Sequence, residues 1–353
     1  MQYPLPLIIF MLLNGVYAKA TTNHSVPALF VFGDSTVDPG NNNFIPTIVK
    51  SNFPPHGIDL PSHVPTGRFC NGKLTTDFIA SHLGIKEMIP PFLDPTLSIE
   101  ELTTGVSFAS ALTGYDPLTA QAGNVISLDK QLEYFKLYKA RMELVMGKEK
   151  MEEHISKSGY VISAGTNDLV VNYFTLPFRR NQYTIVEYED YLLQNTRNFI
   201  QGLLDLGARK IGIVGIAPIG CAPIVRILNF NAPLRDGCVE SYTNVALEYN
   251  KKLQQLLQTI TKENSGAQVV YFDIYRALDD IIRNYKQKGF AEQSKGCCGT
   301  GLLETAFLCN QHSYVCPDRS KFVFWDSIHP TEKTYNLIFL SFRDGIDRLL
   351  LGI

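Results

Sequence analysis

Residues 28–36 read ALFVFGDST, an apolar run that ends abruptly in a Gly-Asp-Ser turn. Continuous apolar runs rich in Phe and Val are typical of strands that are buried on both faces, as in a parallel sheet. In open α/β sheets, ligands bind at the carboxyl ends of the strands. The run therefore predicts a first strand that presents the hydroxyl of Ser35 at the ligand-binding edge of a sheet.

Further runs of this kind recur along the chain. They are short and rich in β-branched or aromatic residues, and they comprise Val106–Ala109, Tyr160–Ser163, Ile211–Val214 and Val269–Phe272. Amphipathic stretches separate them, and this alternation indicates helices on both faces of a parallel sheet. We predict an α/β fold of three layers around a central parallel sheet of about five strands.

The amphipathic stretches locate the helices. After a candidate cap at Ser127, apolar residues recur at helical spacing, namely Leu128, Leu132, Phe135 and Tyr138. Comparable patterns, the last with Pro330 at its expected start, run through Thr76–Leu83, Tyr188–Leu206, Val239–Ile260 and Thr331–Leu350.

The chain reads as one domain over residues 27–353. No linker rich in Gly, Ser or charge divides it, and it contains no internal repeat. Two long segments, Asp38–Lys73 and Gly289–Ser320, are predicted as elaborated loops, the first for its Asn and Pro content and the second for its cysteines.

Composition excludes several classes of partner. The 353 residues are 45% hydrophobic and 19% charged, with a formal net charge of -2. Because Lys and Arg form no block, we expect neither nucleic acid nor an anionic membrane surface as the main partner. Beyond the N-terminus, no segment is long and apolar enough to span a membrane, and nothing indicates an obligate protein partner.

The N-terminus predicts secretion. Residues 5–13 are almost all apolar, and the run ends in Ala18-Lys19-Ala20, which has small residues where a signal peptidase reads them. We interpret residues 1–20 as a signal peptide rather than a buried strand or helix, and we expect an extracellular protein that could reside in the cell wall. Asn23 begins the sequon Asn23-His24-Ser25, so it is a candidate glycosylation site.

The chain has seven cysteines. In an oxidising compartment they would pair, Cys221 with Cys238 around one loop, and the crowded Cys297, Cys298, Cys309 and Cys316 among themselves in a pattern that the spacing leaves open. A zinc site is the alternative for the second group, but the adjacent Cys297 and Cys298 are poorly spaced as ligands and no Cys-x-x-Cys motif is present. Cys70 would remain as a free thiol whose role the sequence does not indicate.

A base for Ser35 is available near the other end of the chain. His329 follows Asp326 by three residues, a spacing that can place the carboxylate beside Nδ1. The carboxylate would then hold the tautomer whose Nε2 accepts the serine proton. We therefore predict a catalytic triad of Ser35, Asp326 and His329.

Acyl transfer also needs hydrogen-bond donors for an oxyanion. The loop after Val106–Ala109 reaches Gly114, whose backbone N–H can approach a ligand because no Cβ intervenes. After Tyr160–Ser163 comes Asn167, which can donate its side-chain amide. We predict these two residues, with the N–H of Ser35, as an oxyanion hole.

Several motifs together resemble the GDSL-type, or SGNH, hydrolases, and specifically the plant extracellular esterases and lipases. The motifs occur in family order and spacing and are Gly33-Asp34-Ser35, Pro39-Gly40-Asn41-Asn42-Asn43, Gly67-Arg68-Phe69, Gly165-Thr166-Asn167-Asp168, Pro218-Ile219-Gly220-Cys221, Gly296-Cys297-Cys298-Gly299 and Asp326-Ser327-Ile328-His329. The resemblance implies a flavodoxin-like fold and ester hydrolysis through an acyl-enzyme, with no metal or other cofactor. It assigns Ser35 as nucleophile, His329 as base and Asp326 as its partner, with Gly114 and Asn167 as oxyanion donors.

The chain departs from the family pattern at three places. Thr36 replaces a Leu, Cys70 replaces a Ser, and Ala111-Leu112 replaces a stretch that is often rich in glycine. The last departure bears on the choice of Gly114.

Two other functions fit the same motifs. An acyltransferase would pass the acyl group to an alcohol instead of water, and a secreted binding protein would have lost catalysis. Among ester substrates, lipid, cutin-like and acetyl esters remain open because the loops would decide between them.

Overall fold

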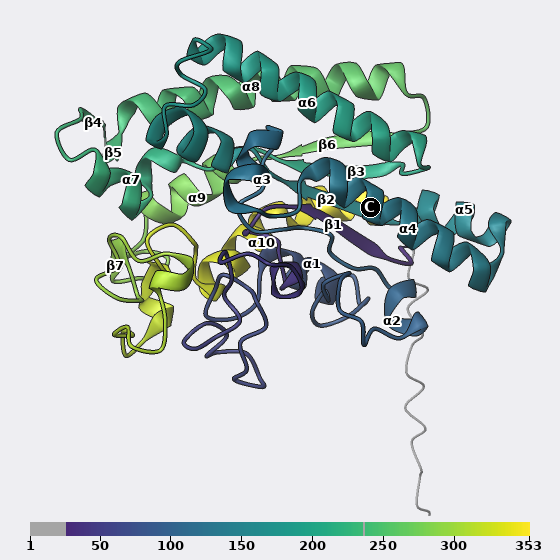
Figure 1. Ribbon diagram of the computed structural model, residues 1–353, viewed down its shortest axis with the longest axis horizontal. Helices are drawn as coiled ribbons and strands as arrows, with labels where there is room; N and C mark the ends of the chain where they lie inside the picture. Colours follow the sequence, from purple (N-terminus) through teal and green to yellow (C-terminus); the bar gives the residue numbers. More distant parts are fainter. Residues whose placement is uncertain (1–25, 236) are drawn as a thin grey trace, which may run out of the picture.

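The computed structural model describes residues 26–235 and 237–353 (Figure 1). The predicted signal peptide and the predicted glycosylation site at Asn23 lie outside the described residues. None of the helices in this described part is both long and apolar enough to cross a membrane.

Within the described residues, the central sheet has four parallel strands in the order β1-β2-β3-β6. They are β1 (Leu29–Gly33), β2 (Gly159–Ser163), β3 (Lys210–Val214) and β6 (Gln268–Phe272). Each strand coincides with a predicted apolar run. Because all four strands are parallel, their carboxyl ends lie at one edge of the sheet.

The fifth predicted strand, Val106–Ala109, lies along the outer edge of β1. The N–H of Val31 donates to the carbonyl of Val106 at 3.1 Å, and the N–H of Phe108 donates back to the carbonyl of Val31 at 2.7 Å. Ser107 forms an isolated bridge with Val31 on one side and with Pro91 on the other, so this segment is not a full strand. With this segment beside β1, the strand order is that of flavodoxin-like folds, and the predicted α/β class is confirmed.

Helices cover both faces of the sheet (Figure 1). On one face lie α4 (Leu128–Met146), α6 (Ile185–Asp205) and α8 (Glu240–Glu263), and on the other lie α1 (Thr75–His82), α9 (Ile274–Arg283) and α10 (Glu332–Ile346). Neighbouring residues of β1 serve opposite faces, since Phe30 packs in the core with α4 and Val31 in the core with α10. This alternation explains why the strands are apolar throughout.

The remaining elements surround these layers. They are α2 (Ile99–Thr103), α3 (Pro117–Gly123), α5 (Lys148–Lys157), α7 (Pro223–Leu228), β4 (Leu234–Arg235), β5 (Cys238–Val239), β7 (Glu292–Gly296), β8 (Phe322–Phe324), the short 3-10 helices Asn41–Phe44, Ile219–Cys221, Ala306–Leu308 and Arg319–Lys321, and the π-helical segments Asp168–Thr175 and Asp347–Leu351.

The predicted helix starts are right at α4 and displaced at α10. Ser127 Oγ accepts a hydrogen bond from the N–H of Lys130 at 3.2 Å, which makes it the N-cap of α4 as predicted. At α10 the cap is Thr331, whose Oγ1 accepts from the N–H of Thr334 at 3.4 Å. Pro330 therefore precedes the cap instead of opening the helix.

The second predicted loop contains regular structure. Within it, β7 pairs in parallel with β8, so the interpretation of Gly289–Ser320 as loop throughout was wrong. The first four residues of β7 are all polar or charged, which hid the strand, and only Gly296 is fully buried.

Three disulfides tie the loops. Cys221 is bonded to Cys238, Cys297 to Cys316 and Cys298 to Cys309, while Cys70 is a buried free thiol. The crowded cysteines are thus occupied by disulfides rather than available to zinc.

Candidate active site

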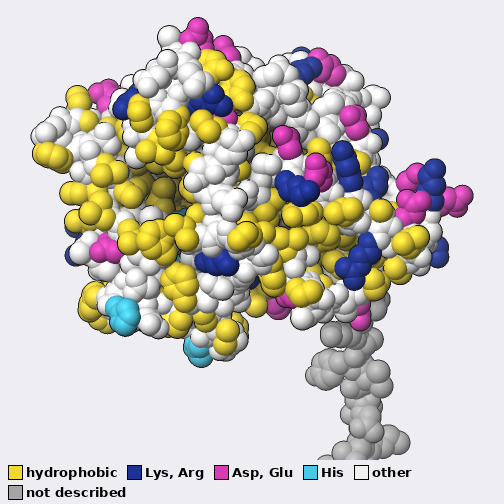
Figure 2. Space-filling view, in the orientation of Figure 1, with side chains coloured by type: hydrophobic (Ala, Val, Ile, Leu, Met, Phe, Trp, Pro, Cys, Tyr) yellow, Lys and Arg dark blue, Asp and Glu magenta, His cyan; other side chains and the backbone are white. Residues whose placement is uncertain are grey.

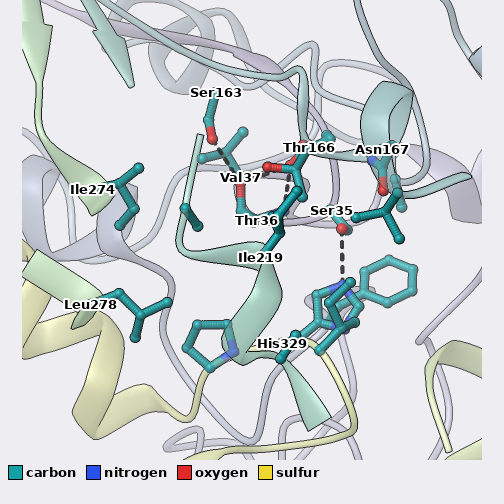
Figure 3. A pocket seen from close by; sticks show the side chains of 18 of the residues that line it. Ser35, Thr36, Val37, Ser163, Thr166, Asn167, Ile219, Ile274, Leu278 and His329 are labelled. Carbon is teal, nitrogen blue, oxygen red and sulfur yellow. Dashed lines mark hydrogen bonds between the residues drawn. The ribbon is translucent and has the colours of Figure 1, made fainter. Parts of the chain in front are cut away.

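Ser35, His329 and Asp326 form one hydrogen-bonded chain. His329 Nε2 lies 2.9 Å from Ser35 Oγ, and His329 Nδ1 lies 2.7 Å from Asp326 Oδ2. Figure 3 shows Ser35 and His329 pointing toward each other across the cavity wall. Residues 294 positions apart thus meet at the carboxyl edge of the sheet.

The turn after β8 orients the Asp326 carboxylate toward His329. Asp326 Oδ1 accepts hydrogen bonds from the N–H groups of Ile328 at 2.9 Å and His329 at 2.7 Å, which leaves Oδ2 for the imidazole. Burial raises the pKa of Asp326, but the charge of His329 and the hydrogen bonds from His329 and Ile328 outweigh it, so that pKa is lowered overall. An ionised carboxylate at Nδ1 keeps Nε2 as the proton acceptor for Ser35.

The end of β1 fixes the position of Ser35. Gly33 has a φ of 133°, and a Cβ there would lie 1.9 Å from the carbonyl oxygen of Ser163, so only glycine fits this crossing. The side chain of Gln131 bonds both backbone groups of Gly33, accepting at 2.9 Å and donating at 3.0 Å. Gln131 was missed from sequence, although a glutamine on the apolar stripe of α4 was a visible signal.

Asp34 is buried directly beside Ser35. Its Oδ1 accepts from the N–H of Thr36 at 2.9 Å and from Thr36 Oγ1 at 2.7 Å. Burial raises the pKa of Asp34 to about 6, against the lowering effect of these hydrogen bonds. The carboxyl group thus stiffens the turn that presents Ser35.

Asn167 lies on the same side of the cavity as Ser35 (Figure 3). Its Nδ2 donates to the carbonyl of Thr113 at 3.0 Å. Because a primary amide carries two N–H groups, this bond leaves one for a substrate oxygen. The position suits the predicted oxyanion donor, and the role itself stays a prediction.

The neighbouring Asp168 anchors the loop that faces Asn167. Its carboxylate accepts from the N–H groups of Tyr115 at 2.8 Å and Asp116 at 3.0 Å, and from the hydroxyl of Thr119. Burial raises its pKa to about 7. Asp168 stands in the motif that carries Asn167, but the sequence alone assigned it no role.

Gly114 is placed differently from the other predicted site residues. A Cβ at Gly114 would lie 2.1 Å from Asp168 Oδ1, so tight packing alone explains this glycine. Gly114 does not line the cavity that contains Ser35, whereas Ala111 and Leu112 of the same loop do. Leu112 has a φ of 70°, a conformation that non-glycine residues rarely adopt. The role of Gly114 as an oxyanion donor stays a prediction.

Ser35 and His329 border a cavity of about 400 Å³ with mainly apolar walls. One part is lined from η2, the π-helical segment Asp168–Thr175, and from α7 by Val170, Val171, Val225 and Leu228. The other part passes Ser35 and reaches α9 and α10, where Ile274, Leu278, Ile338 and Phe342 line it. Figure 3 shows Ile274 and Leu278 well away from the Ser35 and His329 pair.

The described residues contain no evident set of metal ligands. Among residues 26–235 and 237–353, no group of three or more His, Cys, Asp or Glu side chains could hold a metal ion. The chemistry that the site offers is nucleophilic, with a base, an oriented carboxylate and amide donors.

Comparisons with known proteins point to one family. A family model described as GDSL-like Lipase/Acylhydrolase matches residues 29–342. The chain is 52% identical over 330 residues to GDSL esterase/lipase At5g45960 of Arabidopsis thaliana, covering 93% of this chain and 88% of the relative. It is 41% identical over 355 residues to GDSL esterase/lipase At1g06990 of the same plant, covering 98% and 99%.

Solved structures resemble the chain more distantly. A catalytic mutant of Axe2, an acetylxylan esterase from Geobacillus stearothermophilus, superposes with a TM-score of 0.42 at 12% identity, over 91% of this chain and 94% of that one. LAE5, described as an alpha/beta hydrolase from the metagenome of Lake Arreo, gives a TM-score of 0.41 at 12% identity, over 92% and 96%.

Proposed function

Because the chain belongs to the GDSL-like lipase/acylhydrolase family and is a carboxylic ester hydrolase, we propose that it is secreted and cleaves esters of apolar acyl groups through an acyl-enzyme on Ser35. The observation that carries the proposal is the bonded Ser35 and His329 pair at the wall of an apolar cavity.

The reaction follows from the positions of the three side chains. His329 Nε2 takes the Ser35 proton as Oγ attacks the ester carbonyl, and Asp326 stabilises the imidazolium that forms. Donors at Ser35, Gly114 and Asn167 would hold the oxyanion. His329 then gives its proton to the leaving alcohol, and water attacks the acyl-enzyme with His329 again as base.

The cavity favours an aliphatic acyl group over acetyl. Its walls on both sides of Ser35 are built mainly from Val, Ile, Leu and Phe side chains, which bind apolar groups by burial and offer few hydrogen bonds to a polar substrate. Each buried methylene is worth about 0.8 kcal/mol, or roughly a fourfold gain in kcat/KM until the chain fills the cavity.

Secretion is supported by the N-terminal sequence and by the three disulfides. Stable disulfides are typical of proteins that fold in an oxidising compartment. Expression of the full chain in a eukaryotic secretory host should release protein that begins at Thr21, as determined by N-terminal sequencing. Retention of residues 1–20 in the cell-associated protein would contradict secretion through this peptide.

The test of catalysis is hydrolysis of p-nitrophenyl esters from acetate to palmitate by wild type and Ser35→Ala. Wild type should prefer an intermediate or long chain, and Ser35→Ala should lose roughly 10⁴–10⁶ in kcat at an unchanged melting temperature. Wild-type-like turnover by Ser35→Ala would contradict the mechanism. Formation of a new ester when an acceptor alcohol is added would show acyl transfer instead of hydrolysis.

A further inference from the structure

Large apolar side chains crowd the surface where the cavity reaches solvent. Leu228 and Phe307 line the cavity and are also 55% and 50% exposed, so the cavity opens between α7 and the loop held by the Cys298–Cys309 disulfide. Figure 2 shows hydrophobic side chains gathered around a hollow on this side of the molecule, where Figure 1 places α7 and β7.

We call six of these residues the apolar rim. All six are exposed, and they are Ile227, Leu228, Phe230, Leu234, Phe307 and Leu308. Phe230 is the extreme case, at 73% exposure. Single exposed apolar residues are common, but a group of them beside a cavity marks a surface that contacts another apolar phase or molecule.

The two segments that form the apolar rim carry no charge. Residues 227–234 read ILNFNAPL and residues 305–309 read TAFLC, with no Asp, Glu, Lys or Arg. Attraction to an anionic membrane would require Lys or Arg at the contact. Arg226, Arg235 and Glu304 directly flank the two segments, so charged residues border the apolar rim but none lies within it. The chemistry of the apolar rim therefore suits an uncharged, water-insoluble phase.

Disulfides hold both segments in their exposed positions. Cys221–Cys238 closes the segment that contains α7 and residues 227–234, and Cys309 directly follows Leu308. A cross-linked loop has fewer ways to fold its apolar side chains back against the protein. The apolar rim is thus presented to solvent although burial would be favourable.

We propose that the apolar rim docks the enzyme on the surface of an uncharged, water-insoluble ester, from which the acyl group enters the cavity. The inference rests on the proposed ester hydrolysis and adds the physical state of the substrate. Its main support is continuity, because Leu228, Phe307 and Leu308 belong to both the apolar rim and the cavity wall. One apolar surface therefore runs from the outside of the protein toward Ser35.

Binding is measured separately from turnover. In a Ser35→Ala background, the protein is mixed with trioctanoylglycerol droplets and the bound fraction is separated by flotation. The double variant Phe230→Ser/Leu234→Ser changes rim residues outside the cavity lining, and it should lower the partition coefficient by about tenfold or more. The matched control is Leu137→Ser/Leu144→Ser on exposed positions of α4, at the opposite end of the molecule from α7 (Figure 1), and it should bind like its parent. Binding should persist at high salt, since no charge attraction is involved.

Kinetics in the active background complete the test. Phe230→Ser/Leu234→Ser should hydrolyse dissolved p-nitrophenyl butyrate within twofold of wild type but release fatty acid from the droplets about tenfold more slowly. Equal droplet binding by the rim variant and its parent would overturn the inference, as would binding only to vesicles that contain phosphatidylserine. A rim variant that changes only the oligomeric state would show instead that a second copy covers the rim. If wild type hydrolyses no dissolved ester, the proposed function fails, while droplet binding still decides the role of the apolar rim.

Discussion

Asn167 joins two parts of the site through a single amide. One N–H is used on the carbonyl of Thr113, and the cavity wall presents the rest of the group beside Ser35. If the second N–H holds the oxyanion, Asn167→Ala should lower kcat by roughly 10²–10³ with little change in KM. Steady-state kinetics on a dissolved ester measures this.

A shifted loop could also lower the activity of Asn167→Ala. Asn167→Asp keeps the shape of the side chain but removes both amide donors, so it should show a comparable loss of kcat. Near-normal kcat in either variant would exclude Asn167 as an oxyanion donor.

Asp34 makes the stability of the protein depend on pH. Burial raises its pKa in the folded protein to about 6, while its ordinary value is 3.8. Between these values the folded state keeps a proton that the unfolded state has released, so stability falls as the pH rises through this window. The loss amounts to at most about 3 kcal/mol.

The isosteric Asp34→Asn removes this titration and can keep both hydrogen bonds that Oδ1 accepts from Thr36. Urea unfolding between pH 4 and pH 7 should show that wild type loses stability relative to Asp34→Asn as the pH rises. Parallel stability curves for the two proteins would mean that Asp34 is already ionised in the folded state at low pH.

Among the structural elements, the disulfide-bonded loop near the cavity mouth depends most on covalent support. The 3-10 turn Ala306–Leu308 has no fully buried residue, and Ala306 has a φ of 49°. Its neighbour Cys309 is buried and bonded to Cys298. Packing therefore contributes little to the stability of this segment, and we expect the Cys298–Cys309 disulfide to supply most of it.

The double variant Cys298→Ser/Cys309→Ser should therefore lose stability by about 3 kcal/mol, the value expected for closing a loop of this length. Thermal unfolding with and without a reductant checks the result, because reduction should destabilise wild type more than the variant. Cys70→Ala serves as the control, and its response to reductant should match that of wild type because Cys70 is in no disulfide. An unchanged melting temperature in the double variant would show that packing alone holds the loop.

At the scale of the whole molecule, the cavity is assembled from segments that lie far apart in the chain. Its inner part is bounded by Val161 of β2, Leu278 of α9 and Phe342 of α10. If this part holds the acyl chain, Leu278→Trp should shorten it and lower kcat/KM for p-nitrophenyl octanoate by about tenfold relative to acetate. The ratio of the two rate constants is the measured quantity.

Arg276→Trp is the matched control for this prediction. It adds the same side chain to α9 at a position that is 89% exposed, so the octanoate to acetate ratio should stay at the wild-type value. A wild-type ratio in Leu278→Trp as well would place the acyl chain elsewhere, on the side lined by α7.

Much of the fold could be predicted from local sequence. Strands buried on both faces must be apolar throughout, so β1, β2, β3 and β6 were recognisable as uninterrupted runs. The cap at Ser127 was visible because a hydroxyl that bonds the first turn is a local requirement. β7 was missed because its first four residues are polar or charged and only partly buried or exposed, so its pairing depends on the neighbouring strand and not on an apolar pattern.

The sequence by itself determined which apolar runs form strands and which residues, Ser35, Asp326 and His329, are candidates for one site. Strand ends and the Asp326 to His329 spacing are properties of short segments. Only the tertiary structure decided which cysteines pair, that Asp168 packs against Gly114, and that the cavity runs from the apolar rim past Ser35 to α9 and α10. These features arise where distant segments meet. Their energies depend on packing and burial in three dimensions, which no local pattern of residues records.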